Sequence, residues 1–319
     1  MCKHISVMTP CYNEEDNILN LYNEVKKQFE NLPQYTYEHI FIDNFSTDKS
    51  RDILRELAQK DKKVKVILNA RNFGPNRSGS YGMLQATGDA LICIVCDLQD
   101  PPEMIPQFLQ KWEEGYKVVL GQKLKSKENP IMFQVRKLYY RIINWLSETP
   151  QYEGVTGYGL FDKEFLDTMR WMDDPDPYIR GLVPDLGYKT YLLQYTQNKR
   201  EYGKSSYNFN SYFDFAITGV THVSKKPLRI ATMIGMGMSA ISFLLAIVYL
   251  VMKLVKWDSF SMGTAPVLIG MFLLASVQLA FIGVIGEYIG AILTRVTKRP
   301  MVVEEERINF EDDSKNSNR

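Results

Sequence analysis

The segment HISVMTPCYNEED, residues 4–16, places a mostly apolar run directly before a polar, acidic one. An apolar run containing valine and isoleucine is typical of a buried strand, and acidic residues suit the first turn of a following helix. The same order recurs along the first part of the chain. Alternating strands and helices predict an α/β fold with a mostly parallel sheet covered by helices on both faces. The expected strands are His4–Met8, Glu38–Ile42, Val64–Leu68, Ala90–Cys96 and Lys117–Leu120, and the expected helices between them are Asp16–Gln28, Ser50–Ala58 and Gly79–Ala86.

Polar segments follow four of these strands, namely Thr9–Glu15, Asp43–Asp48, Asn69–Asn76 and Asp97–Glu103. Ligands of parallel sheets bind beyond the carboxyl ends of the strands, so we expect the four segments to line one crevice. Taken singly, three of them also fit helix caps, and that alternative stays open. The capping segments would be Asn13–Asp16, Ser46–Asp48 and Asp100–Glu103. Together, their acids could hold the base, ribose and metal-bound diphosphate of a nucleotide. The sequence contains no P-loop and no G-x-G-x-x-G motif, which favours a divalent cation such as Mg²⁺ as the partner of the phosphates.

Composition excludes several classes of protein. The chain has 38 Lys and Arg against 37 Asp and Glu, a balance unlike the basic surface of a nucleic-acid-binding protein. Its 45% hydrophobic residues exclude disorder.

Cys93 and Cys96 form a C-x-x-C pair, but no second pair completes a zinc site. Because apolar residues flank them, we expect inert, buried thiols on opposite faces of a strand.

Two segments lack charge altogether: residues 230–252 and 259–286 contain no Asp, Glu, Lys or Arg. The first segment has 23 residues. A helix of this length is long enough to span a hydrocarbon core of about 30 Å. We therefore expect a transmembrane hairpin with helices at about 230–252 and 267–289. Basic residues flank its outer ends more densely than its loop, which places both termini in the cytoplasm. No secretory signal is seen before the first strand, in agreement with this topology.

The expected organisation has four parts: a domain over residues 1–207, a juxtamembrane amphipathic segment over 208–229, the hairpin over 230–294 and a polar cytoplasmic tail over 295–319. The tail is acidic after Val303, and we expect a solvated extension there.

One further segment, Ile131–Leu146, has apolar residues at helical spacing with Arg136, Lys137 and Arg141 among them. This pattern suits a helix lying on an anionic membrane surface, although an ordinary core-packing helix fits equally well.

Several motifs occur in a fixed order along the chain. They are Thr9–Glu14 (TPCYNE), Ile42–Asp48 (IDNFSTD), Arg71–Gly74 (RNFG), Asp97–Glu103 (DLQDPPE), Arg180–Leu182 (RGL), Gly203–Tyr207 (GKSSY), Lys226–Arg229 (KPLR), Gly286–Gly290 (GEYIG) and Lys298–Pro300 (KRP). Over residues 5–303 this set resembles the family 2 inverting glycosyltransferases that act on polyprenyl phosphate, such as the dolichol-phosphate mannose synthases and the bactoprenol glucosyltransferases. The resemblance implies a GT-A fold, a nucleotide-sugar donor, expected to be UDP-glucose, and an undecaprenyl phosphate acceptor. It also implies inversion at the anomeric carbon, Mg²⁺ or Mn²⁺ as cofactor, and a homo-oligomer, a tetramer in this family, in the plasma membrane.

The resemblance also assigns roles residue by residue. Asp97 and Arg200 match catalytic positions, and Asp97 with Gln99 matches the metal site. The nucleotide-sugar-binding positions are Pro10, Tyr12, Glu14, Asp43, Gln99, Lys123 and Lys204. The basic residues Arg136, Lys137 and Arg141 are the expected contacts of the acceptor's phosphate. No general base is expected, because a lipid monophosphate is already anionic.

The chain departs from the family pattern at several positions. Val95 stands where the family's D-x-D motif begins with an acid, and Asn44 replaces the second of a paired Asp. Ser206 stands where the family has lysine, and Gly157–Leu160 replaces an acidic segment. Two other functions therefore stay open: a transferase that uses another lipid or a saccharide acceptor, and a non-catalytic scaffold that keeps the fold.

Overall fold

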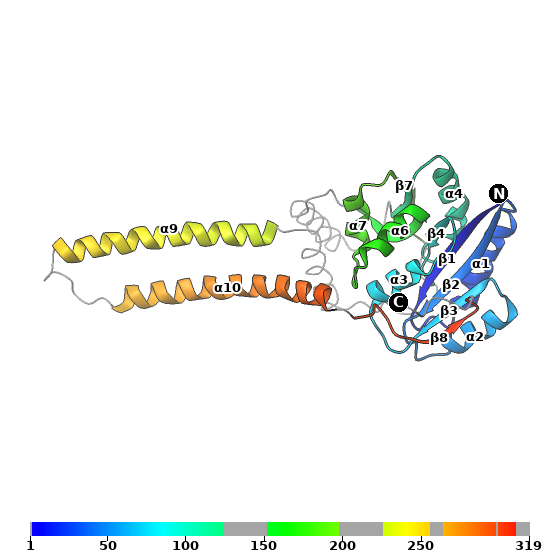
Figure 1. The fold of residues 1–319 in the computed structure, drawn as a ribbon, viewed down its shortest axis with the longest axis horizontal. Helices are drawn as coiled ribbons and strands as arrows, with labels where there is room; N and C mark the ends of the chain where they lie inside the picture. Colours follow the sequence, from blue (N-terminus) through cyan, green and yellow to red (C-terminus); the bar gives the residue numbers. More distant parts are fainter. Residues whose placement is uncertain (1, 124–151, 198–225, 256–263, 298, 311–319) are drawn as a thin grey trace.

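The computed structural model describes residues 2–123, 152–197, 226–255, 264–297 and 299–310. Within them, a sheet with helices on both faces forms one body, and two long helices extend away from it (Figure 1). The strands are β1 (Lys3–Cys11), β2 (Tyr35–Asp43), β3 (Val64–Asn69), β4 (Ala90–Cys93), β5 (Val118–Lys123), β6 (Val155–Asp162), β7 (Thr190–Tyr195) and β8 (Glu304–Ile308). The helices are α1 (Ile18–Glu30), α2 (Ser50–Lys60), α3 (Pro75–Leu84), the short 3₁₀ turn η1 (Pro102–Met104), α4 (Ile105–Glu113), α6 (Lys163–Met172), α7 (Ile179–Leu186), α9 (Lys226–Val255) and α10 (Thr264–Val296).

The strands lie in the order β7-β5-β6-β4-β1-β2-β3-β8. β1 pairs in parallel with β2 and β4, β2 with β3, and β5 with β7, whereas β6 and β8 run antiparallel to their neighbours. The prediction of an α/β fold with a mostly parallel sheet is confirmed, as are all five expected strands. As a result, β1 to β5 and β7 point their carboxyl ends the same way.

Two hydrophobic clusters fill the two faces of the sheet. One contains Leu21 of α1, Leu54 of α2 and Phe108 of α4, and the other contains Met83 of α3 and Phe165 of α6. Side chains alternate along a strand, so each strand contributes to both clusters.

The C-x-x-C cysteines divide between these clusters. Cys93 belongs to the cluster with α3, Cys96 belongs to the cluster with α1, and both thiols are free and buried. The prediction of buried thiols facing opposite ways is confirmed. Burial raises the pKa of the Cys93 thiol well above its usual value, which makes it a poor nucleophile.

The acidic segment after Val303 is not a solvated extension, and that expectation is wrong for residues 304–308. They form β8, the outermost strand on one side of the sheet, which pairs antiparallel with β3. Glu304 accepts a hydrogen bond from the Tyr81 hydroxyl at 2.8 Å, and Arg307 donates to Gln85 at 3.0 Å. These partners lie more than 200 positions away in the sequence, so a local reading of the acidic run could not identify them.

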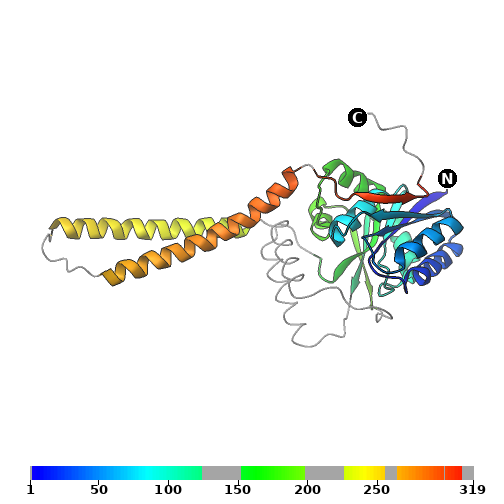
Figure 2. The same cartoon turned by 90° about the horizontal axis from the view of Figure 1, so that it is seen from below.

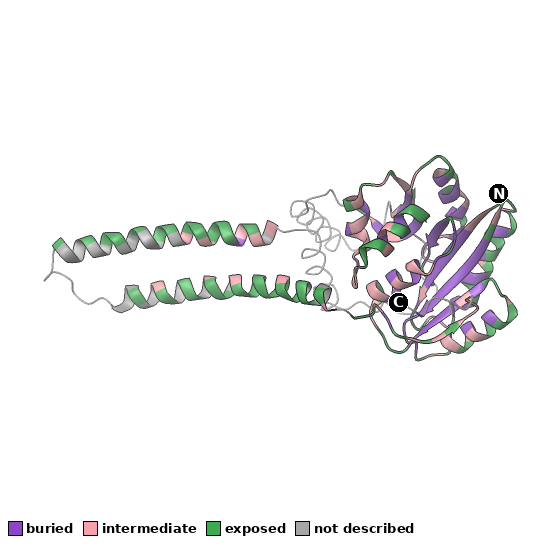
Figure 3. Cartoon of the chain, in the orientation of Figure 1, coloured by how far each residue is buried: buried purple, intermediate pink, exposed green. Residues whose placement is uncertain are grey.

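α9 and α10 lie side by side and extend away from the sheet in both views (Figures 1 and 2). They contain the two segments expected to be helical at 230–252 and 267–289. Most of the side chains described on them are exposed (Figure 3). Over the part of the chain that the structure describes, none of the helices reaches the combination of length and hydropathy that a membrane crossing requires.

Gly159, in β6, is expected to tolerate no side chain. A Cβ at this position would lie 2.3 Å from the carbonyl oxygen of Val119 and 3.0 Å from the Cα of Leu120, both on the neighbouring strand β5. Gly159→Ala should therefore lower the free energy of unfolding by about 1–3 kcal/mol, as for other overpacked sites. Gly79→Ala is the matched control, because a Cβ there meets nothing within 4 Å, and Ala in a helix is about 0.5–1 kcal/mol better than Gly. Chemical denaturation of both variants measures the difference, and equal stabilities would contradict it.

Candidate active site

The predicted site residues gather where parallel strands end. Asp43 is the last residue of β2, Asn69 the last of β3 and Lys123 the last of β5. Tyr12 follows β1, and Asp97 follows β4 by four positions. Because these strands run in one direction, their last residues all lie at the carboxyl end of the sheet. The polar segments therefore follow the strand ends that the sequence predicts.

The loops after β1 and β2 are bound to each other by side chains. The backbone N–H of Asn13 donates to Ser46 Oγ at 2.8 Å, and the backbone N–H of Thr47 donates to the side-chain oxygen Oδ1 of Asn13 at 2.8 Å. The Glu14 N–H donates to Ser50 Oγ at 2.9 Å. Asn13 is thus not the helix cap that its position also suggested: it links two loops, and α1 begins only at Ile18.

Unusual backbone conformations mark the same loops. Asn13, Phe45 and Leu98 have φ angles of 55°, 69° and 55°, in the left-handed region that side chains normally avoid. One of them follows each of β1, β2 and β4. Such conformations cost free energy and persist where the surroundings hold a loop in one shape, which is common at binding sites.

Asp43 has the features of a ligand-binding carboxylate. Its side chain is fully buried, and Oδ2 accepts the N–H groups of Phe45 at 3.1 Å and Ser46 at 3.0 Å. Oδ1 is buried as well and has no hydrogen-bond partner among the described residues. Burial raises the pKa of Asp43, although the Ser46 hydrogen bonds and the Arg51 charge oppose that rise. A buried oxygen without a partner is costly, and a bound ligand with an N–H or O–H group would satisfy it.

Asn44, one of the departures from the family pattern, has a structural use. Its Nδ2 donates to Asn72 Oδ1 at 2.9 Å, and its Oδ1 accepts the Phe73 N–H at 2.9 Å. An aspartate could not donate the first of these bonds. The amide therefore links the loop after β2 to the loop after β3.

The acids after β4 differ from each other in their surroundings. Asp97 is half-buried and accepts the Gln99 N–H at 3.2 Å. Asp100 is buried and accepts a short hydrogen bond from the Tyr195 hydroxyl. Burial raises the pKa of Asp100, although the Tyr195 hydrogen bond and the Lys123 charge oppose that rise. Asp97 is therefore the more accessible of the two carboxylates, whereas one oxygen of the buried Asp100 is bound to Tyr195.

A divalent cation fits this site only together with a substrate. The described residues hold no cluster of three or more His, Cys, Asp or Glu side chains suited to a metal. Val95 cannot be a ligand, which leaves Asp97 as the carboxylate, with the Gln99 amide beside it. Mg²⁺ needs only one or two carboxylates when phosphates and water complete its coordination. The donor set therefore suits a cation that arrives with a diphosphate.

The remaining predicted residues have mixed outcomes. Tyr12 is 39% exposed, and the Glu14 carboxylate accepts from Asn17 Nδ2 at 2.6 Å. Pro10 lies within β1, one position before its end. Five predicted residues lie outside the described part of the chain: Arg200, Lys204, Arg136, Lys137 and Arg141. Arg51, whose Nε lies 3.6 Å from Asp43 Oδ2, was not predicted, because one arginine at a helix start has no distinctive pattern.

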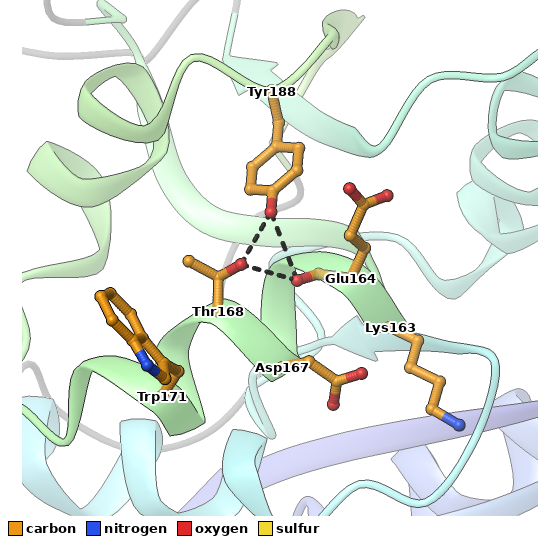
Figure 4. Close-up of a pocket in the computed structure, with 6 residues that line it drawn as sticks. All are labelled: Lys163, Glu164, Asp167, Thr168, Trp171 and Tyr188. Carbon is orange, nitrogen blue, oxygen red and sulfur yellow. Dashed lines mark hydrogen bonds between the residues drawn. The ribbon is translucent and has the colours of Figure 1, made fainter.

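A pocket of about 540 Å³ lies elsewhere, on α6 (Figure 4). Thr168 and Tyr188, which line it, share a 2.7 Å hydrogen bond. α6 follows β6, which runs against β4 and ends opposite the first residue of that strand, Ala90. The pocket is therefore on the side of the sheet away from the carboxyl ends, and none of the predicted site residues lines it.

Comparisons with known proteins agree with this geometry. The model of glycosyl transferase family 2 matches residues 6–167, and that of the GtrB C-terminal hairpin matches residues 226–292. A bactoprenol glucosyl transferase of Shigella phage SfX is 32% identical over 93% of this chain and 97% of its own length. The uncharacterized glycosyltransferase YkcC of Bacillus subtilis is 33% identical, covering 98% and 97% of the two chains.

Among solved structures, a glucosyl-3-phosphoglycerate synthase from Mycobacterium tuberculosis has a TM-score of 0.49 at 19% identity, covering 69% of this chain and 76% of that one. The ordered family motifs, the mostly parallel α/β sheet and the relatives that match over almost their whole length lead to one conclusion. The chain belongs to glycosyl transferase family 2 and carries the GtrB C-terminal hairpin.

Proposed function

We propose that this protein transfers a sugar from a nucleotide sugar to a polyprenyl phosphate at the cytoplasmic face of a membrane. The observation that carries the proposal is the buried Asp43 Oδ1, which has no hydrogen-bond partner among the described residues and lies at the carboxyl end of the sheet, the end at which the loop with Asp97 begins. The relatives named bactoprenol glucosyl transferase, which match over almost the whole chain, support the polyprenyl acceptor. By the same resemblance we propose UDP-glucose as the donor and undecaprenyl phosphate as the acceptor.

In this mechanism Asp43 binds the nucleoside of the donor through its free oxygen. Asp97 and Gln99 hold the diphosphate end, with Lys123 nearby at the end of β5. A bound Mg²⁺ or Mn²⁺ would neutralise the departing nucleoside diphosphate. The acceptor's phosphate oxygen attacks the anomeric carbon from the opposite side, so the anomeric centre inverts. Positioning and charge stabilisation supply the catalysis, which explains why no base is required.

We further propose that α9 and α10 anchor the enzyme in the bilayer. The proposal rests on the sequence of both helices, including side chains outside the described part, because charge is absent from 230–252 and 259–286. Large apolar side chains such as Met233, Leu279 and Val296 are exposed on them. Exposed apolar surface of this extent is typical of a surface that meets lipid. Arg136, Lys137 and Arg141 remain the proposed contacts of the acceptor's phosphate.

A transfer assay tests the proposal. Full-length protein in detergent is mixed with short-chain polyprenyl phosphate and each of several radiolabelled nucleotide sugars, with Mg²⁺, Mn²⁺ or chelator. We expect label from one donor to enter the organic phase in a metal-dependent, acid-labile product. A separate experiment tests the membrane anchor. When membranes are washed with alkaline carbonate before detergent is added, the protein should stay in the membrane pellet.

Each negative result contradicts a different part of the proposal. Label transferred only to a saccharide or another lipid would contradict the polyprenyl acceptor. No transfer from any donor, beside an active relative as control, would favour the scaffold function that Val95 left open. Release of the protein by carbonate would contradict the membrane hairpin without affecting the transferase activity.

A further inference from the structure

β8 connects the hairpin to the nucleotide site. It follows α10 and pairs with β3, and its acids reach back to α2. Glu305 accepts from Arg51 at 2.8 Å, and Glu306 accepts from Arg55 at 2.8 Å. The two ion pairs are neighbours on the same strand and helix, but only Arg51 also approaches Asp43.

Arg51 lies between two carboxylates. One of its terminal nitrogens donates to Glu305, while its Nε lies 3.6 Å from Asp43 Oδ2, too far for a hydrogen bond. The Nε is buried and has no hydrogen-bond partner among the described residues, and its guanidinium lies 5.7 Å from the centre of the Phe45 ring. The Arg51 side chain is 16% exposed and Asp43 is fully buried, so their contact is shielded from water, whereas Glu305 on the other side of Arg51 is 48% exposed.

The geometry suggests a competition for the guanidinium. Arginine and a carboxylate prefer a two-pronged pairing, in which two N–H groups meet both oxygens. If Arg51 made that pairing with Asp43, it would occupy Oδ1, the oxygen that is now free. The hydrogen bond to Glu305 holds the Arg51 guanidinium away from Asp43 and so prevents the two-pronged pairing.

We propose that Glu305 is a positioning residue: by holding Arg51 away from Asp43 it keeps Asp43 Oδ1 free for the donor nucleotide, so that the strand following the hairpin completes the nucleotide site. This inference rests on the proposed function, because it assigns Asp43 to nucleotide binding. It gives β8 a role in donor affinity beyond docking the C-terminal segment on the sheet.

The test compares Glu305→Gln with Glu306→Gln in the full chain in detergent. Each variant removes one carboxylate from β8, and each breaks one ion pair to α2. Titration calorimetry with UDP, GDP, CDP and dTDP in the presence of Mg²⁺ gives the dissociation constants. We expect Glu305→Gln to raise the dissociation constant of the preferred nucleotide about three- to tenfold, and Glu306→Gln to leave it unchanged. Thermal midpoints should change by the same small amount in both, because both pairs are partly exposed.

A double variant separates positioning from docking. In an Arg51→Gln background no guanidinium can reach Asp43, so adding Glu305→Gln should have no further effect on nucleotide affinity. An equal loss of affinity in the Glu305 and Glu306 variants, or no loss in either, would overturn the inference while leaving the proposed function intact. If the wild-type protein binds none of the four nucleotides, the proposed function fails, and this inference fails with it.

Discussion

Asp97→Asn is expected to lower the rate of sugar transfer about a hundredfold or more while the protein keeps its fold. In the proposed mechanism Asp97 holds the cation that accompanies the donor's diphosphate, because Val95 cannot bind a cation and Asp100 is buried and accepts a hydrogen bond from Tyr195. Asparagine keeps the shape and can still accept the Gln99 N–H, but it lacks the negative charge. Initial rates at saturating donor, measured at several Mg²⁺ concentrations, give the effect.

Asp89→Asn is the control for this experiment. Asp89 accepts the His4 N–H at 2.9 Å, at the opposite end of the sheet, so its variant should retain wild-type rates. Near-normal turnover of Asp97→Asn would contradict the assignment of the cation to this carboxylate. A rate restored by more Mg²⁺ would instead point to weakened binding of the cation at an otherwise intact site.

Asp43→Asn should weaken nucleotide binding at least tenfold without destabilising the protein. Asparagine can accept the Phe45 and Ser46 N–H groups with its oxygen, but it presents an NH₂ group where Oδ1 now lies. A ligand N–H or O–H group would then meet a donor instead of an acceptor, which is strongly unfavourable. Calorimetric titration with the preferred nucleotide measures the loss, and unchanged affinity would remove Asp43 from the site.

The pH dependence of stability supplies a second readout for this variant. Burial raises the pKa of Asp43 in the folded protein, so its negative charge opposes folding at neutral pH. That penalty fades as the pH falls through the folded pKa, and it is absent below the unfolded pKa. The variant should therefore be as stable as the wild type or more so at neutral pH, and the difference should vanish in acid.

Glu38→Gln is the matched control, since Glu38 is a buried acid on the same strand with the opposite behaviour. Burial alone would raise its pKa, but Lys65, at 2.5 Å, and hydrogen bonds from Ser6 and Thr87 lower it overall. This acid stabilises the fold above its unfolded pKa, and the stabilisation is lost as the pH falls through its folded pKa. Its variant should lose stability at neutral pH yet bind nucleotide normally.

The sequence predicts the strand ends well because strand direction follows from local patterns. Apolar runs around Val7 and Ile67 identify strands, and alternation with helices makes them parallel, so Asp43 and Lys123 come to one end of the sheet. The caps were harder to predict, since the same side chain can serve a helix or another loop. Asn13 and Asp100 both bond to distant residues instead of to the nearest helix.

β8 was not predictable for a related reason. Glu304, Glu305 and Glu306 carry like charges and have no apolar alternation, so in isolation they indicate a solvated segment. They form a strand because Arg51, Arg55 and Tyr81 provide partners from α2 and α3. These partners come next to the three glutamates only after the chain has folded.

The position of β8 also has a consequence for biosynthesis. Chains emerge from the ribosome starting with the N-terminus, so β3 is made about 240 residues before its neighbour β8. Until residues 304–308 emerge, the backbone N–H and C=O groups along one side of β3 have no β8 to pair with. Unpaired strands of this kind are sites of aggregation. The catalytic domain therefore stays vulnerable throughout synthesis of the hairpin, and the last strand closes the sheet only after the hairpin is complete.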